Sequence, residues 1–183
     1  MPLSPTPVTA SEAKQAETLL RAIEESRTAL AGNPDNAELR LRLALALESH
    51  GDIDDAIKGY RAVIVRDPSY VYAYNNLGVL YARKGLYEEA IGKFGDALFR
   101  DSQHESARFN SGLIFRKTGE LDPAARQFQL LLKANPKHAE PHARLGQILD
   151  DQGLSNRPSD ITGKPLPSSR SSAPATVLSP KPL

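Results

Sequence analysis

Residues 71–104 read VYAYNNLGVLYARKGLYEEAIGKFGDALFRDSQH, and this stretch decides how the rest of the chain is interpreted. It contains two amphipathic runs that meet at Gly85. Apolar residues that recur every three or four positions lie on one side of a helix. Glycine adopts tight-turn backbone conformations without strain. The stretch therefore predicts two helices joined by a short turn.

The same skeleton returns when the sequence is shifted by 34 residues in either direction. The matching positions carry turn glycines, small residues, alanines and aromatic residues. They are Gly51, Gly85, Gly119 and Gly153; Ala44, Gly78, Gly112 and Gly146; Ala56, Ala90 and Ala124; and Tyr60, Phe94 and Phe128. The stretch is therefore one unit of an internal repeat.

Residues 77–81 read LGVLY, and prolines close successive units at Pro34, Pro68 and Pro136. With the 34-residue period, this pattern resembles the tetratricopeptide repeat family over about residues 37–153. The resemblance implies an all-α fold, a right-handed α-solenoid of helix-turn-helix units. It also implies a non-enzymatic scaffold or adaptor that binds an extended segment or helix of a partner protein in a concave groove.

The units are expected to have different surroundings at the two ends of the chain. A Pro-rich start predicts a flexible lead, and Thr9 followed by Glu12 predicts a capped helix start. Proline and serine dominate the end of the chain, which predicts a disordered, mildly basic tail. The expected parts are a lead (1–8), a capping helix or half-repeat (9–36), three repeats (37–70, 71–104 and 105–138, together 37–138), a C-terminal capping helix (139–153) and the tail (154–183).

Inside the repeats, small residues such as Gly78 are expected to let two helix backbones approach closely. We also expect close helix packing at Gly59, Gly92 and Gly95, which fall inside second helices. The second helices are expected to begin after three residues, Asp52, Leu86 and Asp122.

The composition excludes several classes of function. A net charge of +1 gives no global attraction to nucleic acid, and the absence of cysteine removes disulfides and thiolate chemistry. No apolar run reaches the length of a membrane span, and no secretion signal is recognised, so we expect a cytoplasmic protein. His138 and His142 stand four apart, but we interpret them as turn and cap residues. No metal site, cofactor or catalytic group is predicted.

The expected binding surface is the inner face of the first helix of each unit. Its residues are Arg42, Tyr72, Asn75, Asn76, Val79, Arg83, Phe109, Asn110, Leu113, Arg116, Lys117 and Arg144. Asn76 and Asn110 lie 34 residues apart and resemble two rungs of the asparagine ladder of peptide-gripping family members. Two asparagines making two bonds each supply only about 4 kcal/mol, so the aromatic, apolar and basic residues must add affinity.

One subgroup of the family holds acidic C-termini of chaperones with a clamp of lysine, asparagine and arginine. Leu41 and Leu45 stand where the first repeat's lysine and asparagine are expected, and Ser106 and Asn110 where the third repeat's lysine and arginine are expected. Only Asn76 matches, so a chaperone-tail adaptor is disfavoured.

Two alternatives to a groove-binding scaffold remain at this stage. The chain could assemble with itself into a homo-oligomer, with an incompletely capped end or its basic tail docking on the slightly acidic body of another copy. Alternatively, the tail itself could be the ligand of a proline-recognising domain or a modification target, as Ser179-Pro180 weakly indicates.

Overall fold

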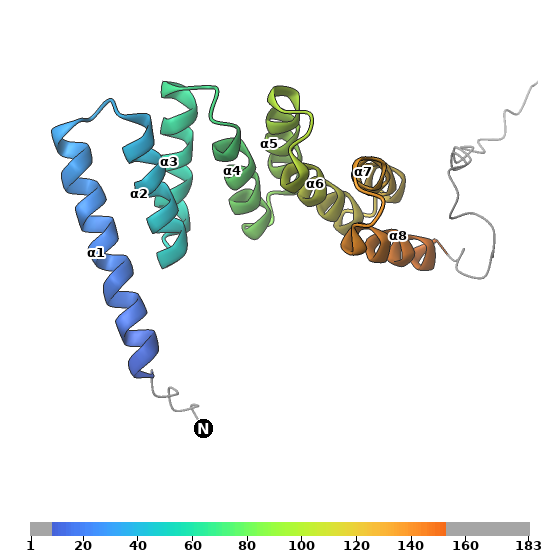
Figure 1. Ribbon diagram of the computed structural model, residues 1–183, viewed down its shortest axis with the longest axis horizontal. Coiled ribbons are helices and arrows are strands. Elements are labelled where there is room, and N and C mark those ends of the chain that lie inside the picture. The colour runs from blue at the N-terminus through green and yellow to red at the C-terminus, as the bar shows by residue number, and fades with distance from the viewer. Residues whose placement is uncertain (1–8, 153–183) are drawn as a thin grey trace, which may run out of the picture.

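The computed structural model describes residues 9–152, which form a row of helices packed side by side (Figure 1). Within these residues there are eight helices and no strand: α1 (Ala10–Gly32), α2 (Ala37–His50), α3 (Ile53–Arg66), α4 (Val71–Arg83), α5 (Tyr87–Arg100), α6 (Glu105–Lys117), α7 (Leu121–Ala134) and α8 (Ala139–Asp151). This confirms the predicted all-α array. The expected lead (1–8) and tail (154–183) lie outside the described residues.

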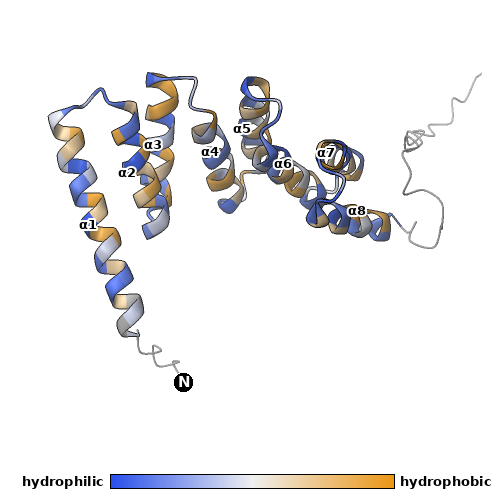
Figure 2. Ribbon diagram, in the orientation of Figure 1, coloured by the Kyte–Doolittle hydropathy of each residue, from blue (hydrophilic) through white to orange (hydrophobic). Residues whose placement is uncertain are grey.

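Each helix packs mainly on the next helix in the chain, and α4 also touches α6. The core accordingly divides into three clusters along the row: one centred on Tyr60 and Leu77, one on Phe94, and one on Phe128 and Ile148. The helices carry hydrophobic and hydrophilic residues on different sides (Figure 2). A row of this kind is stabilised by contacts between neighbours rather than by one central core.

In two of the helix pairs, a glycine on the first helix faces an aromatic ring on the second. A Cβ atom added at Gly78 would lie 2.7 Å from Phe94, and one added at Gly112 would lie 2.8 Å from Phe128. Both rings are almost completely buried. Gly78 and Gly112 therefore leave room for a packed ring, which a side chain at either position would displace.

Two sequence-based expectations about the second helices are wrong. Gly92 and Gly95 have open space around them, so close packing does not explain them, whereas a Cβ at Gly59 would lie 2.8 Å from Ala44. Helix α7 begins at Leu121 and not after Asp122. Its proline therefore occupies the third helical position, still in the first turn, where amides have no acceptor within the helix.

The turns follow the predicted glycines. Gly51, Gly85 and Gly119 have φ angles of 99°, 78° and 86°, a region that residues with a Cβ rarely adopt. After α2, the amides of Gly51 and Asp52 both donate to the carbonyl of Leu47, which closes the helix end. Asn36 opens the same helix, since its side chain accepts a hydrogen bond from the amide of Leu39 at 3.0 Å.

Helix α1 differs from the others because its 23 residues carry it past the ends of α2 and α3 (Figure 1). Ile23 is buried, whereas Leu20 is 53% exposed. We propose that α1 and α8 cap the two ends of a three-repeat array. Among the described helices, none has both the length and the apolar character needed to cross a membrane.

A matched pair of glycine substitutions tests the helix contact. Gly78→Leu is expected to lower the free energy of unfolding by about 1–3 kcal/mol, because the new side chain overlaps the buried Phe94 ring. Gly92→Leu is expected to raise it by up to about 1 kcal/mol, because leucine favours a helix over glycine and meets open space. Urea denaturation measures both values. Equal effects of the two substitutions would contradict the packing model.

Candidate functional site

The first helices of successive pairs are joined directly by side chains. The Nδ2 of Asn110 on α6 donates to the Oδ1 of Asn75 on α4 at 3.2 Å. Arg116 on α6 donates through Nε to Asp151 at 2.8 Å and through Nη1 to Gln147 at 2.9 Å, both on α8. These contacts place α4, α6 and α8 next to one another. We call the surface formed by α2, α4, α6 and α8 the wall.

A chain of hydrogen bonds runs along the wall and all its donors point the same way. Asn110 donates to Asn75, and Asn75 donates through Nδ2 to the Oδ1 of Asn76 at 3.1 Å. Asn76 donates to the hydroxyl of Tyr60 at 3.2 Å, and that hydroxyl donates to the carboxylate of Glu48. The chain links α6, α4, α3 and α2. Buried polar groups that are all satisfied in this way fix the relative positions of the helices that carry them.

This chain changes the interpretation of the predicted asparagine ladder. Asn75 is only 7% exposed, so it offers little surface for the partner contact that the sequence predicted. Asn76 uses its oxygen and its nitrogen within the protein. Asn110 is half-buried and donates one N–H of its side chain to Asn75. The asparagines thus hold neighbouring repeats together, and an extended peptide would compete for groups that already have partners.

The hydroxyl of Tyr60 joins the two halves of the hydrogen-bond chain, because it accepts from Asn76 and donates to Glu48. Burial, followed by the hydrogen bond and negative charge of Glu48, raises the pKa of its hydroxyl well above the ordinary value. The group stays neutral at physiological pH and keeps its proton for Glu48. The sequence had indicated only that position 60 is an aromatic packing position. The signal that was missed is that Phe94 and Phe128, at the equivalent positions, carry no hydroxyl.

The predicted basic residues divide into paired and unpaired groups. Arg42 binds Glu38 at 3.0 Å, Arg144 binds Glu140 at 3.3 Å, and Arg116 binds Asp151. Lys117 lies 5.2 Å from the centre of the Tyr87 ring. Arg83 is exposed, and no ion pair joins it to the residues that the structure describes. The strongest basic attraction for a partner is therefore at Arg83 and Lys117, which occupy the same repeat position.

The predicted apolar residues of the wall are exposed to different degrees. Tyr72 is 68% exposed and packs edge-on against His104, with ring centres 5.1 Å apart. Phe109 packs edge-on against Phe128 at 5.5 Å and is half-buried. Val79 and Leu113 are half-buried against the core clusters. Tyr72 is the aromatic residue that the wall offers most openly to a partner.

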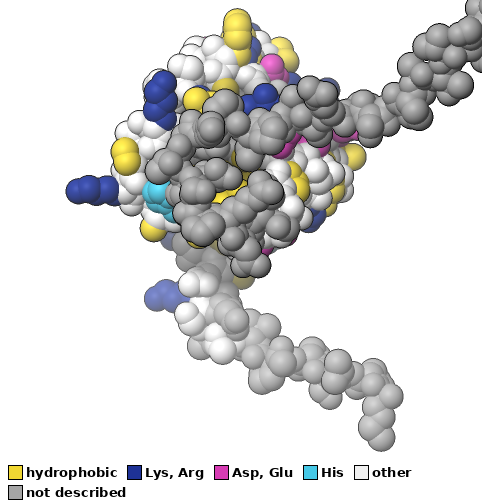
Figure 3. All heavy atoms as spheres, turned by 90° about the vertical axis from the view of Figure 1, so that its right-hand side faces the viewer, with side chains coloured by type: hydrophobic (Ala, Val, Ile, Leu, Met, Phe, Trp, Pro, Cys, Tyr) yellow, Lys and Arg dark blue, Asp and Glu magenta, His cyan; other side chains and the backbone are white. Residues whose placement is uncertain are grey.

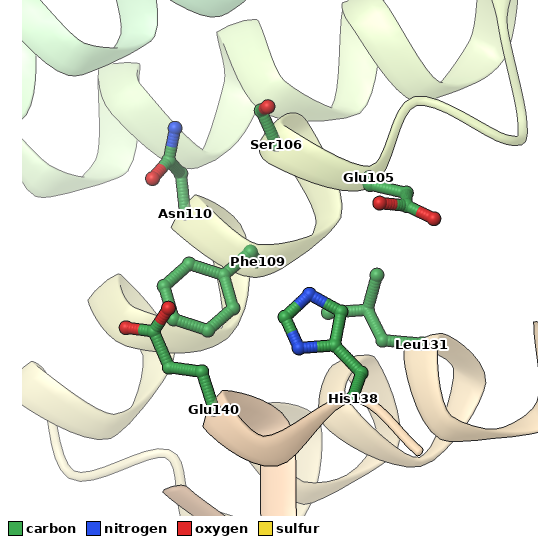
Figure 4. Close-up of a pocket in the computed structure, with 7 residues that line it drawn as sticks. All are labelled: Glu105, Ser106, Phe109, Asn110, Leu131, His138 and Glu140. Carbon is green, nitrogen blue, oxygen red and sulfur yellow. The ribbon is translucent and has the colours of Figure 1, made fainter. Parts of the chain in front are cut away.

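A pocket of about 350 Å³ opens between α6 and α8 (Figure 4). It is lined by Glu105, Ser106, Phe109, Asn110, Leu131, His138 and Glu140. Phe109 and Leu131 give it an apolar floor. The carboxylates of Glu105 and Glu140 lie on opposite sides of it (Figure 4). Phe109 and Asn110 were predicted as binding residues, whereas His138 was interpreted as a turn residue.

A metal site finds no support in the part of the chain that the structure describes. Within residues 9–152, no three histidine or acidic residues come together as metal ligands. His142 instead lies 2.8 Å from the carbonyl oxygen of Pro136. Seen from the α8 end, lysine and arginine side chains stand apart from one another on the visible face (Figure 3).

Comparisons with known proteins agree with this geometry. A family model described as a tetratricopeptide repeat matches residues 9–60, 41–105 and 89–139. Curated proteins gave no match to the chain.

Solved structures resemble the fold at low sequence identity. One of MamA is 22% identical, with a TM-score of 0.72, and covers 82% of this chain and 88% of its own. One of YrrB, described as having an unusual peptide-binding site, is 24% identical, with a TM-score of 0.64 and coverage of 73% and 69%. The first such domain of Spaghetti (RPAP3), bound to the HSP90 peptide SRMEEVD, is 19% identical, with a TM-score of 0.61 and coverage of 64% and 93%.

Removing the hydroxyl of Tyr60 tests the hydrogen-bond chain. Tyr60→Phe is expected to lower the free energy of unfolding by about 1–3 kcal/mol near neutral pH, because Glu48 and Asn76 lose a partner. The folded pKa lies above the unfolded value, so the hydroxyl contributes fully below about pH 10 and loses its contribution above it. Urea denaturation of both proteins across this range should show the difference shrinking with rising pH. A difference that grows would contradict the assignment.

Proposed function

Because this chain belongs to the tetratricopeptide repeat family, we propose that it is a non-enzymatic scaffold that binds an extended segment or helix of another protein along the wall. Repeat arrays present long continuous surfaces of this kind. We place the protein in the cytoplasm and assign it no cofactor. Two of the similar structures, that of YrrB with its unusual peptide-binding site and that of RPAP3 with a bound HSP90 peptide, support this mode of binding but indicate no partner for this chain.

One observation carries the proposal: an exposed Tyr72 and an open pocket lie one repeat apart on the same wall. Tyrosine is enriched among residues that dominate binding energy, because it buries a large area and loses little entropy. A partner that covers Tyr72 and reaches the pocket would gain apolar contacts at two points. Such anchors replace the peptide-gripping asparagines as the main source of affinity.

Charge along the wall supports the same arrangement. At both ends the outermost helices carry a glutamate and an arginine that pair with each other, Glu38 with Arg42 on α2 and Glu140 with Arg144 on α8. Between them, the equivalent positions hold Tyr72 with Asn76 and Ser106 with Asn110. At these two repeat positions the middle of the wall is uncharged, which lowers the desolvation cost when a partner covers them.

The pattern argues against an acidic chaperone tail as the partner. Leu41 and Leu45 are hydrophobic, and Asn110 is engaged with Asn75. A terminal carboxylate would find no lysine or arginine at these positions. We infer a partner segment held mainly by its apolar and aromatic side chains, with Arg83 and Lys117 offering charge at the margin.

Self-association is a second candidate, favoured by two exposed hydrophobic residues on the second helices. Val65 is 83% exposed and Phe99 is 90% exposed, and they occupy the same repeat position on α3 and α5. An exposed phenylalanine favours association with a second surface that can bury it. Light scattering at rising protein concentration, with Phe99→Ala as the comparison, tests this candidate. A monomer at every concentration would eliminate it. The tail-ligand alternative concerns residues outside the described range.

Two aromatic substitutions separate the wall from the second helices. Tyr72→Ala on the full chain is expected to reduce affinity for a recovered partner by about tenfold or more. Phe99→Ala removes an even more exposed aromatic residue on α5 and should leave that affinity unchanged. Pull-down with quantitative mass spectrometry identifies partners, and titration calorimetry measures the affinities. Loss of binding in Phe99→Ala alone would show that the wall is the wrong surface.

A further inference from the structure

The pocket between α6 and α8 lies where one repeat has a serine in place of the tyrosine of the previous repeat. At the junction of α4 and α6, Tyr72 packs edge-on against His104. Thirty-four residues later, the equivalent pair is Ser106 and His138. Serine is too small to fill the space, and both residues line the pocket. The protein thus shows, one repeat away, which group fits against a histidine at this position.

The two histidines also differ in their hydrogen bonds. His104 is 8% exposed and its Nδ1 accepts a bond from the amide of Ala107 at 3.2 Å, which caps α6. His138 precedes α8 but makes no such capping bond with its side chain. Its ring faces the pocket opposite Phe109 (Figure 4). His138 is therefore free to contact a ring supplied from outside.

The rim of the pocket favours an aromatic group that carries a donor. Glu105 and Glu140 offer only hydrogen-bond acceptors when ionised. A phenol can place its ring on Phe109 and Leu131 and donate its hydroxyl to one of these carboxylates. The chain already uses this combination, because buried Tyr60 donates to Glu48. A phenyl ring would lose the polar half of the interaction.

The acidic rim alone does not indicate a lysine or arginine guest. Glu105 and Glu140 lie in the first turns of α6 and α8, where carboxylates compensate the positive end of the helix dipole. Glu140 is also paired with Arg144 at 3.3 Å. The shape and apolar floor of the pocket therefore indicate which side chain it binds better than its charge does.

We propose that this pocket binds the tyrosine side chain of a partner segment lying on the wall, in the place that Tyr72 takes against His104 one repeat earlier. The proposal rests on the proposed function and names the side chain that the wall selects. The chain's own residues 153–183 contain no phenylalanine, tyrosine or tryptophan, so the C-terminal segment cannot supply the ring.

The experiment uses small analogues of side chains and the full chain labelled with ¹⁵N. p-Cresol stands for tyrosine, toluene for phenylalanine and n-butylammonium for lysine. p-Cresol is expected to shift the amide signals of Ser106, Phe109 and His138 with a dissociation constant on the order of millimolar. Toluene should bind several-fold more weakly. No shift at these amides, or tighter binding of n-butylammonium, would overturn the proposal.

A filled pocket provides the matched control. Ser106→Tyr places a tyrosine where Tyr72 stands one repeat earlier and should weaken p-cresol binding about tenfold or more. Glu38→Tyr puts the same residue at the same repeat position of α2, away from the pocket, and should leave binding unchanged. If Ser106→Tyr fails to fold, the double variant Glu105→Ala, Glu140→Ala, which removes both acceptors, should weaken p-cresol but not toluene. Equal binding by all variants would overturn the proposal.

The outcomes also separate this inference from the function on which it rests. A partner that needs Tyr72, together with absent p-cresol binding, would overturn the tyrosine pocket and leave the scaffold standing. p-Cresol binding without a recoverable partner would count against the scaffold and leave the pocket's preference for a phenol standing. Concentration-dependent broadening of the pocket signals that disappears in Phe99→Ala would show that a second copy of the chain fills the pocket, and would also overturn the proposal.

Discussion

The structure depends on the close approach of two helices at a small residue. Gly78 and Gly112 each leave a space that a buried phenylalanine fills, and in the first pair Gly59 leaves space for Ala44. This contact sets the distance and angle within each pair. Because the contact recurs every 34 residues, the pairs stack at a constant interval. The wall is a consequence of that interval, since first helices follow one another at equivalent positions.

Polar side chains then tie neighbouring pairs together. The chain from Asn110 to Glu48 crosses several helices, and Arg116 continues the connection to α8. Deeply buried members such as Tyr60 and Asn75 have partners within the chain, as buried polar groups require. A partner bound at Asn110 would therefore touch a group whose other bond stabilises the adjacent repeat. Binding at the wall and the geometry of the array share these residues.

The units differ from one another mainly on the wall, which is the surface proposed to bind a partner. The core positions vary little from unit to unit, whereas the wall changes from ion pairs at its ends to tyrosine, asparagine and serine in the middle. Ser106 stands where the previous unit has Tyr72 and lines a pocket, while the same unit keeps the Gly112 contact with Phe128. In a repeat protein, such a position can change without loss of the fold because it lies outside the contact that defines the interval.

The sequence by itself determined the helices, their pairing and their turns, because these depend on local periodicity, on small residues and on glycines with a left-handed backbone. Periodicity also predicted which residues stand on the first helix of each unit. Only the tertiary structure decided how wall side chains are used, since hydrogen-bond partners such as Asn110 and Asn75 come from different helices. The tertiary structure shows that the space around Gly92 is open, that Asn75 is buried, and that a pocket lies beside Ser106. A repeat fixes where each side chain stands along the helix, but its neighbours in space determine whether it packs, pairs or remains available.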